Sequence, residues 1–116
     1  MRRVRYITRM QTMAQIQERL GVPMEAIREF CQRWNIVELA LFGSIVRDDF
    51  GPESDVDVMV RFGPEGMAPL PWGTIGVKMG LEDLLGRSVD VVVKGNIKNP
   101  YRLRSISRDY TVMYAA

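Results

Sequence analysis

The segment of residues 55–62 (DVDVMVRF) constrains the fold more than any other part of this sequence. Asp55 and Asp57 alternate with valines, and successive side chains of a β-strand point to opposite faces. The segment therefore predicts a strand with one apolar face, whose other face begins with two carboxylates. Such a strand needs a layer of helices over its apolar face.

Strand and helix signals alternate along the rest of the chain. Further strands are predicted at residues 36–42, 88–94 and 110–114. Capping signals and helical spacing predict helices over residues 12–21, 23–34 and 74–85 and after Asn99. Glycine and proline at residues 63–73 predict a mobile excursion. The fold class that results is α/β or α+β, with one sheet covered by helices.

The composition narrows the kinds of chemistry that are open to the chain. Its 116 residues have room for one hydrophobic core. There is no histidine, and Cys31 is the single cysteine, at helical spacing with apolar neighbours. We expect Cys31 to be a core residue, so catalysis must use carboxylates and a metal.

No apolar run approaches the ~20 residues of a membrane span, and the arginine-rich start lacks the apolar stretch of a secretory signal. We expect a cytoplasmic protein. The net charge of +2 is modest. Clustered arginines near both ends are more typical of a solvated surface than of a nucleic-acid interface.

Carboxylates on two predicted strands suggest a metal site. Asp55 and Asp57 point the same way and would repel each other unless a cation lay between them. Asp90 lies among valines in a predicted interior strand, where an unpaired charge is costly. If the strands are neighbours, three acids surround one site, and oxygen ligands favour Mg²⁺ or Mn²⁺. An EF-hand is excluded, because Val60 and Gly66 occupy its glycine and glutamate positions.

Gly43 and Ser44 come directly after the predicted strand at residues 36–42. Glycine allows a phosphate to approach the backbone, and a serine hydroxyl with the following N–H groups binds phosphate oxygens. An ordinary turn with a capping serine explains the same pair. It is not a Walker loop, since no Gly-Lys-Ser/Thr follows.

Taken together, residues 41–60 (LFGSIVRDDFGPESDVDVMV) resemble the signature of the polymerase-beta-like nucleotidyltransferases. That pattern is Gly-Ser, a spacer of about ten residues, and Asp-x-Asp, and the spacer here is residues 45–54. Arg47, Ser54, residues 81–93 and the final YTVMYAA are similar to minimal members of MNT type. The resemblance divides the chain into a basic helical extension at residues 1–22 and a nucleotidyltransferase domain at residues 23–116.

The resemblance implies a role for each site residue and a partner for the chain. Metal binding and catalysis would fall to Asp55, Asp57 and Asp90, and nucleotide binding to Gly43, Ser44, Arg47 and Ser54. Minimal members resemble antitoxins that transfer AMP from ATP to a tyrosine of a HEPN-type toxin. The resemblance therefore implies Mg²⁺ as the cofactor, ATP as the donor, and a homo- or hetero-oligomer.

Two other functions remain open at this point. A non-enzymatic antitoxin could neutralise a partner by binding alone, using tyrosine, tryptophan and arginine side chains as anchors. Residues 17–34 also have a faint likeness to a DNA-binding helix-turn-helix. Phe30, Cys31 and Trp34 are too apolar for a recognition surface, which makes DNA binding the weaker alternative.

Overall fold

The computed structural model describes residues 11–64, 71–95 and 98–116. The helices are α1 (Met13–Leu20), α2 (Met24–Arg33), the 3₁₀ helix η2 (Gly43–Val46), α3 (Pro71–Leu85) and α4 (Pro100–Asp109). The strands are β1 (Ile36–Phe42), β2 (Val56–Phe62), β3 (Val89–Val93) and β4 (Thr111–Ala115). The predicted α/β class is confirmed.

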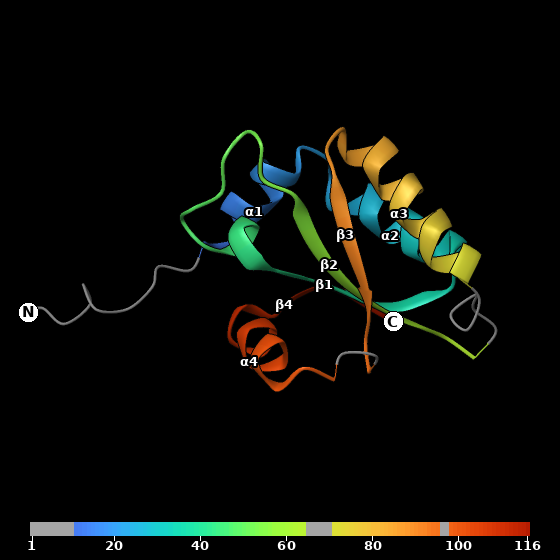
Figure 1. The fold of residues 1–116 in the computed structure, drawn as a ribbon. Coiled ribbons are helices and arrows are strands. Elements are labelled where there is room, and N and C mark those ends of the chain that lie inside the picture. The colour runs from blue at the N-terminus through green and yellow to red at the C-terminus, as the bar shows by residue number, and fades with distance from the viewer. Residues whose placement is uncertain (1–10, 65–70, 96–97) are drawn as a thin grey trace, which may run out of the picture.

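The four strands form one mixed sheet in the order β3-β2-β1-β4. β1 is antiparallel to both β2 and β4, whereas β2 and β3 run parallel. Helices α1, α2 and α3 cover one face of the sheet, and α4 lies on the other (Figure 1). The acidic strand β2 is therefore an interior strand with helices above and below it.

The main core lies between the sheet and α1, α2 and α3. Val56, Val58 and Val60 place the apolar face of β2 in this core, as their alternation predicts. The apolar stripe of α2 faces them, and Cys31 is completely buried within it. The prediction that Cys31 is a core residue is confirmed.

Local capping signals determine where several helices begin and end. Thr12 and Gln15 form a capping box at the start of α1, and Gly21 ends that helix with φ 75°. The Asn99 side chain accepts hydrogen bonds from the first turn of α4. The sequence predicts Pro23 as the first residue of the second helix. In the structure Pro23 is the N-cap, and α2 begins one residue later, at Met24.

Helix α3 begins at Pro71, whereas the sequence predicted its start at residue 74. The expectation was wrong because proline fits the first turn of a helix, where its missing N–H costs nothing. Residues 65–70 of the predicted excursion lie outside the described residues. Gly76 and Gly80 of α3 pack against the rings of Trp34 and Phe30, which leave no room for larger side chains there.

Helix α1 precedes the segment that carries the resemblance but packs into the same core. Its side chains Ile16 and Leu20 are 1% and 4% exposed. Over the part of the chain that the structure describes, none of the helices is long and apolar enough to cross a membrane.

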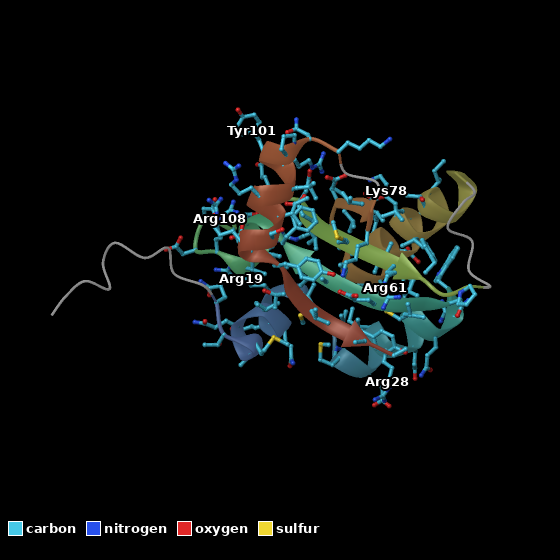
Figure 2. All side chains as sticks on the ribbon, turned by 90° about the horizontal axis from the view of Figure 1, so that it is seen from below. Arg19, Arg28, Arg61, Lys78, Tyr101 and Arg108 are labelled. Carbon is cyan, nitrogen blue, oxygen red and sulfur yellow. The ribbon has the colours of Figure 1, made fainter. Side chains whose placement is uncertain are left out.

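The second face of the sheet is only partly covered. Figure 2 looks onto this face, with α4 across one end and Arg61 on the strands beyond it. A small cluster of Phe42, Met59, Val92 and Ile106 joins α4 to the sheet. The candidate site lies on this face.

Candidate active site

Asp57 and Asp90 lie side by side on the sheet face that carries α4. Parallel pairing of β2 with β3 places Asp57 opposite Asp90, and neighbouring strands are about 4.8 Å apart. The valines that flank each aspartate face the main core on the other side. The strand order, which the sequence left open, thus brings two of the three predicted carboxylates together. The prediction of an interior strand for Asp90 was wrong, because β3 is an edge strand of the sheet and the Asp90 side chain is 51% exposed.

The Asp57 carboxylate is held in an electrostatically unfavourable place. Burial raises the pKa of Asp57 to about 6, and the negative charges of Asp90 and Asp55 add to the rise. Arg102 and Arg47 oppose it. Burial and neighbouring negative charges both destabilise the ionised carboxylate. A cation bound beside Asp57 would relieve this repulsion.

Gly43 packs directly against Asp57. Phe42, the last residue of β1, pairs with Asp57 across the strands, so the next residue lies beside the carboxylate. Gly43 has φ 78°, and a Cβ atom there would overlap Oδ2 of Asp57 and lie 3.1 Å from its Cγ. Glycine is required both by its backbone conformation and by this contact. Ser44 follows at the start of η2 and is partly exposed.

Arg19 of α1 fixes the end of the Gly-Ser turn. Its Nη1 donates to the backbone carbonyls of Ser44, Ile45 and Arg47 at 3.3, 2.9 and 2.5 Å. These oxygens lie at the C-terminal end of η2, which attracts a positive charge. The guanidinium also lies 5.2 Å from the centre of the Phe50 ring.

Arg87 holds the other end of the spacer between Gly-Ser and Asp-x-Asp. Its Nη1 donates to the carbonyls of Gly51 and Ser54 at 3.0 and 2.8 Å, and its guanidinium lies 4.3 Å from the Phe50 ring centre. The Ser54 hydroxyl accepts a hydrogen bond from the Gly51 amide at 2.9 Å. Asp55 follows this fixed turn, outside β2, and is exposed.

Arg47 is held by carboxylates. Nη1 pairs with Asp109, which is 2% exposed, while Nε and Nη2 each lie 3.2 Å from the Asp49 carboxylate. The hydrogen bonds that Arg47 donates to Asp49 and, to a smaller extent, to Asp109 raise its pKa. This ion pair ties the turn after η2 to the end of α4. The sequence suggested Arg47 as a phosphate ligand, and the role of Asp109 was missed.

Arg102 is the second residue that sequence reasoning missed. From the first turn of α4, its Nη2 lies 3.3 Å from Oδ2 of Asp90. The basic cluster near the C-terminus was visible in the sequence as a charge pattern. Only the packing of α4 on the sheet shows which of its arginines reaches the carboxylates.

The oxygen atoms of the site can be compared with the ligands that a divalent metal ion requires. Mg²⁺ is commonly bound through one or two carboxylates, with waters and substrate phosphates completing its shell. Asp57 and Asp90 provide such a pair of hard oxygen donors. Within the residues that the structure describes, no three acidic, cysteine or histidine side chains form a ready-made metal cluster. The site thus suits an ion that shares its ligands with a substrate, and Asp55 would have to turn inward to join it.

Comparison with known proteins identifies the family of this chain. Residues 23–112 match the nucleotidyltransferase domain family. The protein adenylyltransferase MntA of Thermococcus cleftensis is 34% identical over 90 residues, which cover 78% of this chain and 85% of that protein. A Methanocaldococcus jannaschii protein, provisionally named a protein adenylyltransferase, is 34% identical over 100 residues, covering 86% of this chain and 96% of that protein.

Solved structures share the fold. One provisionally described as a minimal nucleotidyltransferase is 27% identical, with TM-score 0.64, and the match covers 86% of this chain and 97% of that chain. A toxin–antitoxin structure with AMP-PNP has 14% identity and TM-score 0.65, covering 82% and 75% of the two chains. A complex of tri-AMPylated Shewanella oneidensis HEPN toxin with MNT antitoxin has 14% identity and TM-score 0.58, covering 87% and 73%. At 14% identity, the last two show the fold alone.

The family match and the fold define a nucleotidyltransferase. The chain belongs to the nucleotidyltransferase domain family, among its minimal members of MNT type, and is an enzyme of the nucleotidyltransferase class whose relatives include proteins named protein adenylyltransferases. The family resemblance that the sequence motifs suggested is confirmed.

Proposed function

We propose that this enzyme transfers AMP from ATP to a tyrosine hydroxyl of a HEPN-type toxin and thereby acts as its antitoxin, with Mg²⁺ or Mn²⁺ as the cofactor. The observation that carries this proposal is the Asp57–Asp90 pair on adjacent strands, packed against the Gly43 turn. The relatives named as protein adenylyltransferases support a protein as the acceptor. ATP as the donor fits a cytoplasmic reaction.

The proposed role of the three acids follows from their placement. Asp57 and Asp90, with Asp55 turned inward, would hold the metal, which when bound neutralises the phosphates and the attacking oxygen. The acceptor oxygen forms a bond to the α-phosphorus while the bond from that phosphorus to the β-phosphate oxygen breaks. Pyrophosphate leaves, and the hydroxyl proton passes to a carboxylate, a role that the family resemblance assigns to the exposed Asp90.

The turn that opens with Gly43 would hold the triphosphate. Backbone N–H groups at the start of η2 and the partly exposed Ser44 hydroxyl are phosphate donors of the expected kind. The Ser54 hydroxyl accepts from Gly51 and still has its own proton to donate to a phosphate. Binding of phosphate by Arg47 remains a prediction. Its nitrogens face carboxylates, so contact with phosphate would first require release of the exposed Asp49.

The partner proposal is supported by the structures that share this fold. One contains a HEPN toxin carrying AMP groups together with an MNT antitoxin, and another contains AMP-PNP. The sheet face beside the acids is only partly covered by α4 (Figure 2), which leaves space for an acceptor protein. A cavity of about 280 Å³ between α4 and the sheet, partly walled by Met59, Leu103 and Ile106, can receive an apolar group of a substrate.

Co-expression of this chain with a HEPN-type toxin tests the proposal. Mass spectrometry of the partner should show an added AMP on tyrosine with the parent chain, and none with Asp57→Asn. Loss of the adduct without loss of neutralisation would favour the antitoxin that acts by binding alone. An adduct that persists in Asp57→Asn would contradict the assignment of the site.

A further inference from the structure

Arg102 is the cation of α4 that faces the acidic site. Its Nη2 lies 3.3 Å from Oδ2 of Asp90, and its charge lowers the pKa of Asp57. Ile106, four residues later, is buried against the sheet at 4% exposure. Residues four apart share one face of a helix, so Arg102 lies on the sheet-facing side of α4.

The other arginines of α4 point elsewhere. The Arg108 side chain is 68% exposed, and Arg104 lies 6.0 Å from the exposed Tyr101 ring. Figure 2 shows Tyr101 and Arg108 projecting from opposite ends of the helix. The orientation of Arg102 toward the acids is therefore specific to that residue and not a general property of a basic helix.

Stability does not account for this contact. The side chains of Arg102 and Asp90 are 49% and 51% exposed, and ion pairs of such exposure contribute about 0–1 kcal/mol. Both ends of α4 are fixed by other means, namely the Asn99 cap at the start and the Asp109–Arg47 pair at the end. The position of α4 is thus fixed without the Arg102–Asp90 contact, and the helix places the Arg102 guanidinium beside the acids.

On the basis of the proposed function, we propose that Arg102 binds the triphosphate of the nucleotide substrate and that Asp90 holds it in place until nucleotide and metal arrive. Once Asp90 serves as a metal ligand, the guanidinium loses its carboxylate and can turn to a phosphate oxygen. Its planar donors match phosphate well, and its charge stabilises the departing pyrophosphate. Arg102 is then a substrate-binding residue on the opposite side of the site from the Gly43 turn.

The assignment makes opposite predictions for two ligands. Removing Arg102 deletes a phosphate contact but also a cation that competes with metal for Asp90. Arg102→Gln should therefore weaken binding of α,β-methylene ATP in Mg²⁺ by at least about tenfold. Binding of Mn²⁺ alone should stay equal or become tighter. Arg102→Lys, which keeps a point charge, should fall between the parent and Arg102→Gln for the nucleotide.

Titration calorimetry with the nucleotide analogue and electron paramagnetic resonance with Mn²⁺ provide the two measurements. Arg104→Gln is the matched control, because it removes the same charge from the same helix without facing the acids. Affinity for the analogue within twofold of the parent in Arg102→Gln would overturn the assignment of Arg102 alone, as would an equal loss in Arg104→Gln. Absence of analogue binding by the parent chain would overturn the proposed function and this assignment with it.

Discussion

The Cα atom of Gly43 packs against the Asp57 carboxylate, so closely that a Cβ atom would overlap Oδ2. The two residues come from separate motifs, the Gly-Ser turn and the Asp-x-Asp strand, and the β1–β2 pairing brings them into contact. The turn proposed to bind phosphate and the carboxylate proposed to bind the metal are thus built as one unit, and a disturbance in either must reach the other.

Gly43→Ala should abolish nucleotide transfer. The change forces an alanine into φ 78°, which costs about 1–2 kcal/mol, and also displaces the Asp57 side chain. Gly21→Ala is a matched control, because Gly21 has φ 75° but nothing within 4 Å of an added Cβ. Both variants should lose stability in urea unfolding, and only Gly43→Ala should lose Mn²⁺ binding. Normal Mn²⁺ binding in Gly43→Ala would show that the contact does not position Asp57.

Asp57→Asn should stabilise the metal-free protein at neutral pH. The pKa of Asp57 is about 6 in the folded chain against an ordinary 3.8, so the folded state binds more protons between these values. Stability conferred by the neutral carboxyl group is therefore lost as the pH rises from about 4 to about 6. The asparagine variant should be more stable at pH 7 by on the order of 1 kcal/mol, since solvent screens part of the charge.

Urea unfolding with a chelator present, at pH 4 and pH 7, measures this effect. The difference between parent and Asp57→Asn should nearly vanish at pH 4. Asp83→Asn, at an exposed position on α3, controls for a general change in net charge. A parent chain more stable than Asp57→Asn at pH 7 would mean that the carboxylate has a favourable partner in the metal-free fold.

Arg47→Met should be strongly destabilising, because it leaves Asp109 buried without its main cation. Breaking a buried pair from one side typically costs about 3–5 kcal/mol, and the partly exposed guanidinium reduces that to about 2–3 kcal/mol. Asp109→Asn should cost less, since Arg47 keeps Asp49. Denaturant unfolding of both variants and of the double variant gives the coupling. Arg28→Met is the control. It removes the exposed Arg28–Glu25 ion pair and should cost under about 1 kcal/mol. An equally small cost for Arg47→Met would refute a structural role for the Arg47–Asp109 pair.

Cys31 should be inert toward thiol reagents in the folded protein. The side chain is completely buried, and burial raises its pKa to about 12. A thiol in this state has almost no thiolate at pH 8. Its reaction with Ellman's reagent should appear only after unfolding in guanidinium chloride. Fast modification under native conditions would mean that α2 detaches from the core.

Local patterns were enough to predict most elements but not their contacts. The alternation in β2, the Thr12–Gln15 box and the Asn99 cap each depend on residues close in sequence, and all three were predicted. The glycine- and proline-rich segment around Pro71 predicts a loop and hence a start of α3 at residue 74, whereas the helix begins at Pro71.

The acids of the site could be named from the sequence, whereas their neighbours could not. Asp57 and Asp90 were candidates because each interrupts an apolar strand, but only the parallel β2–β3 pairing makes them adjacent. The Arg47–Asp109 and Arg102–Asp90 pairs join distant segments through the packing of α4. No spacing rule within the chain indicates such contacts.

Transfer of label from α-labelled ATP to the purified HEPN-type partner tests the central claim most directly. The parent chain should label the partner in Mg²⁺ and lose that activity with a chelator or in Asp57→Asn, while Gly21→Ala retains it. Equal labelling by the parent and Asp57→Asn, or no labelling by any chain in Mg²⁺, would contradict a nucleotidyl transfer that depends on the paired carboxylates.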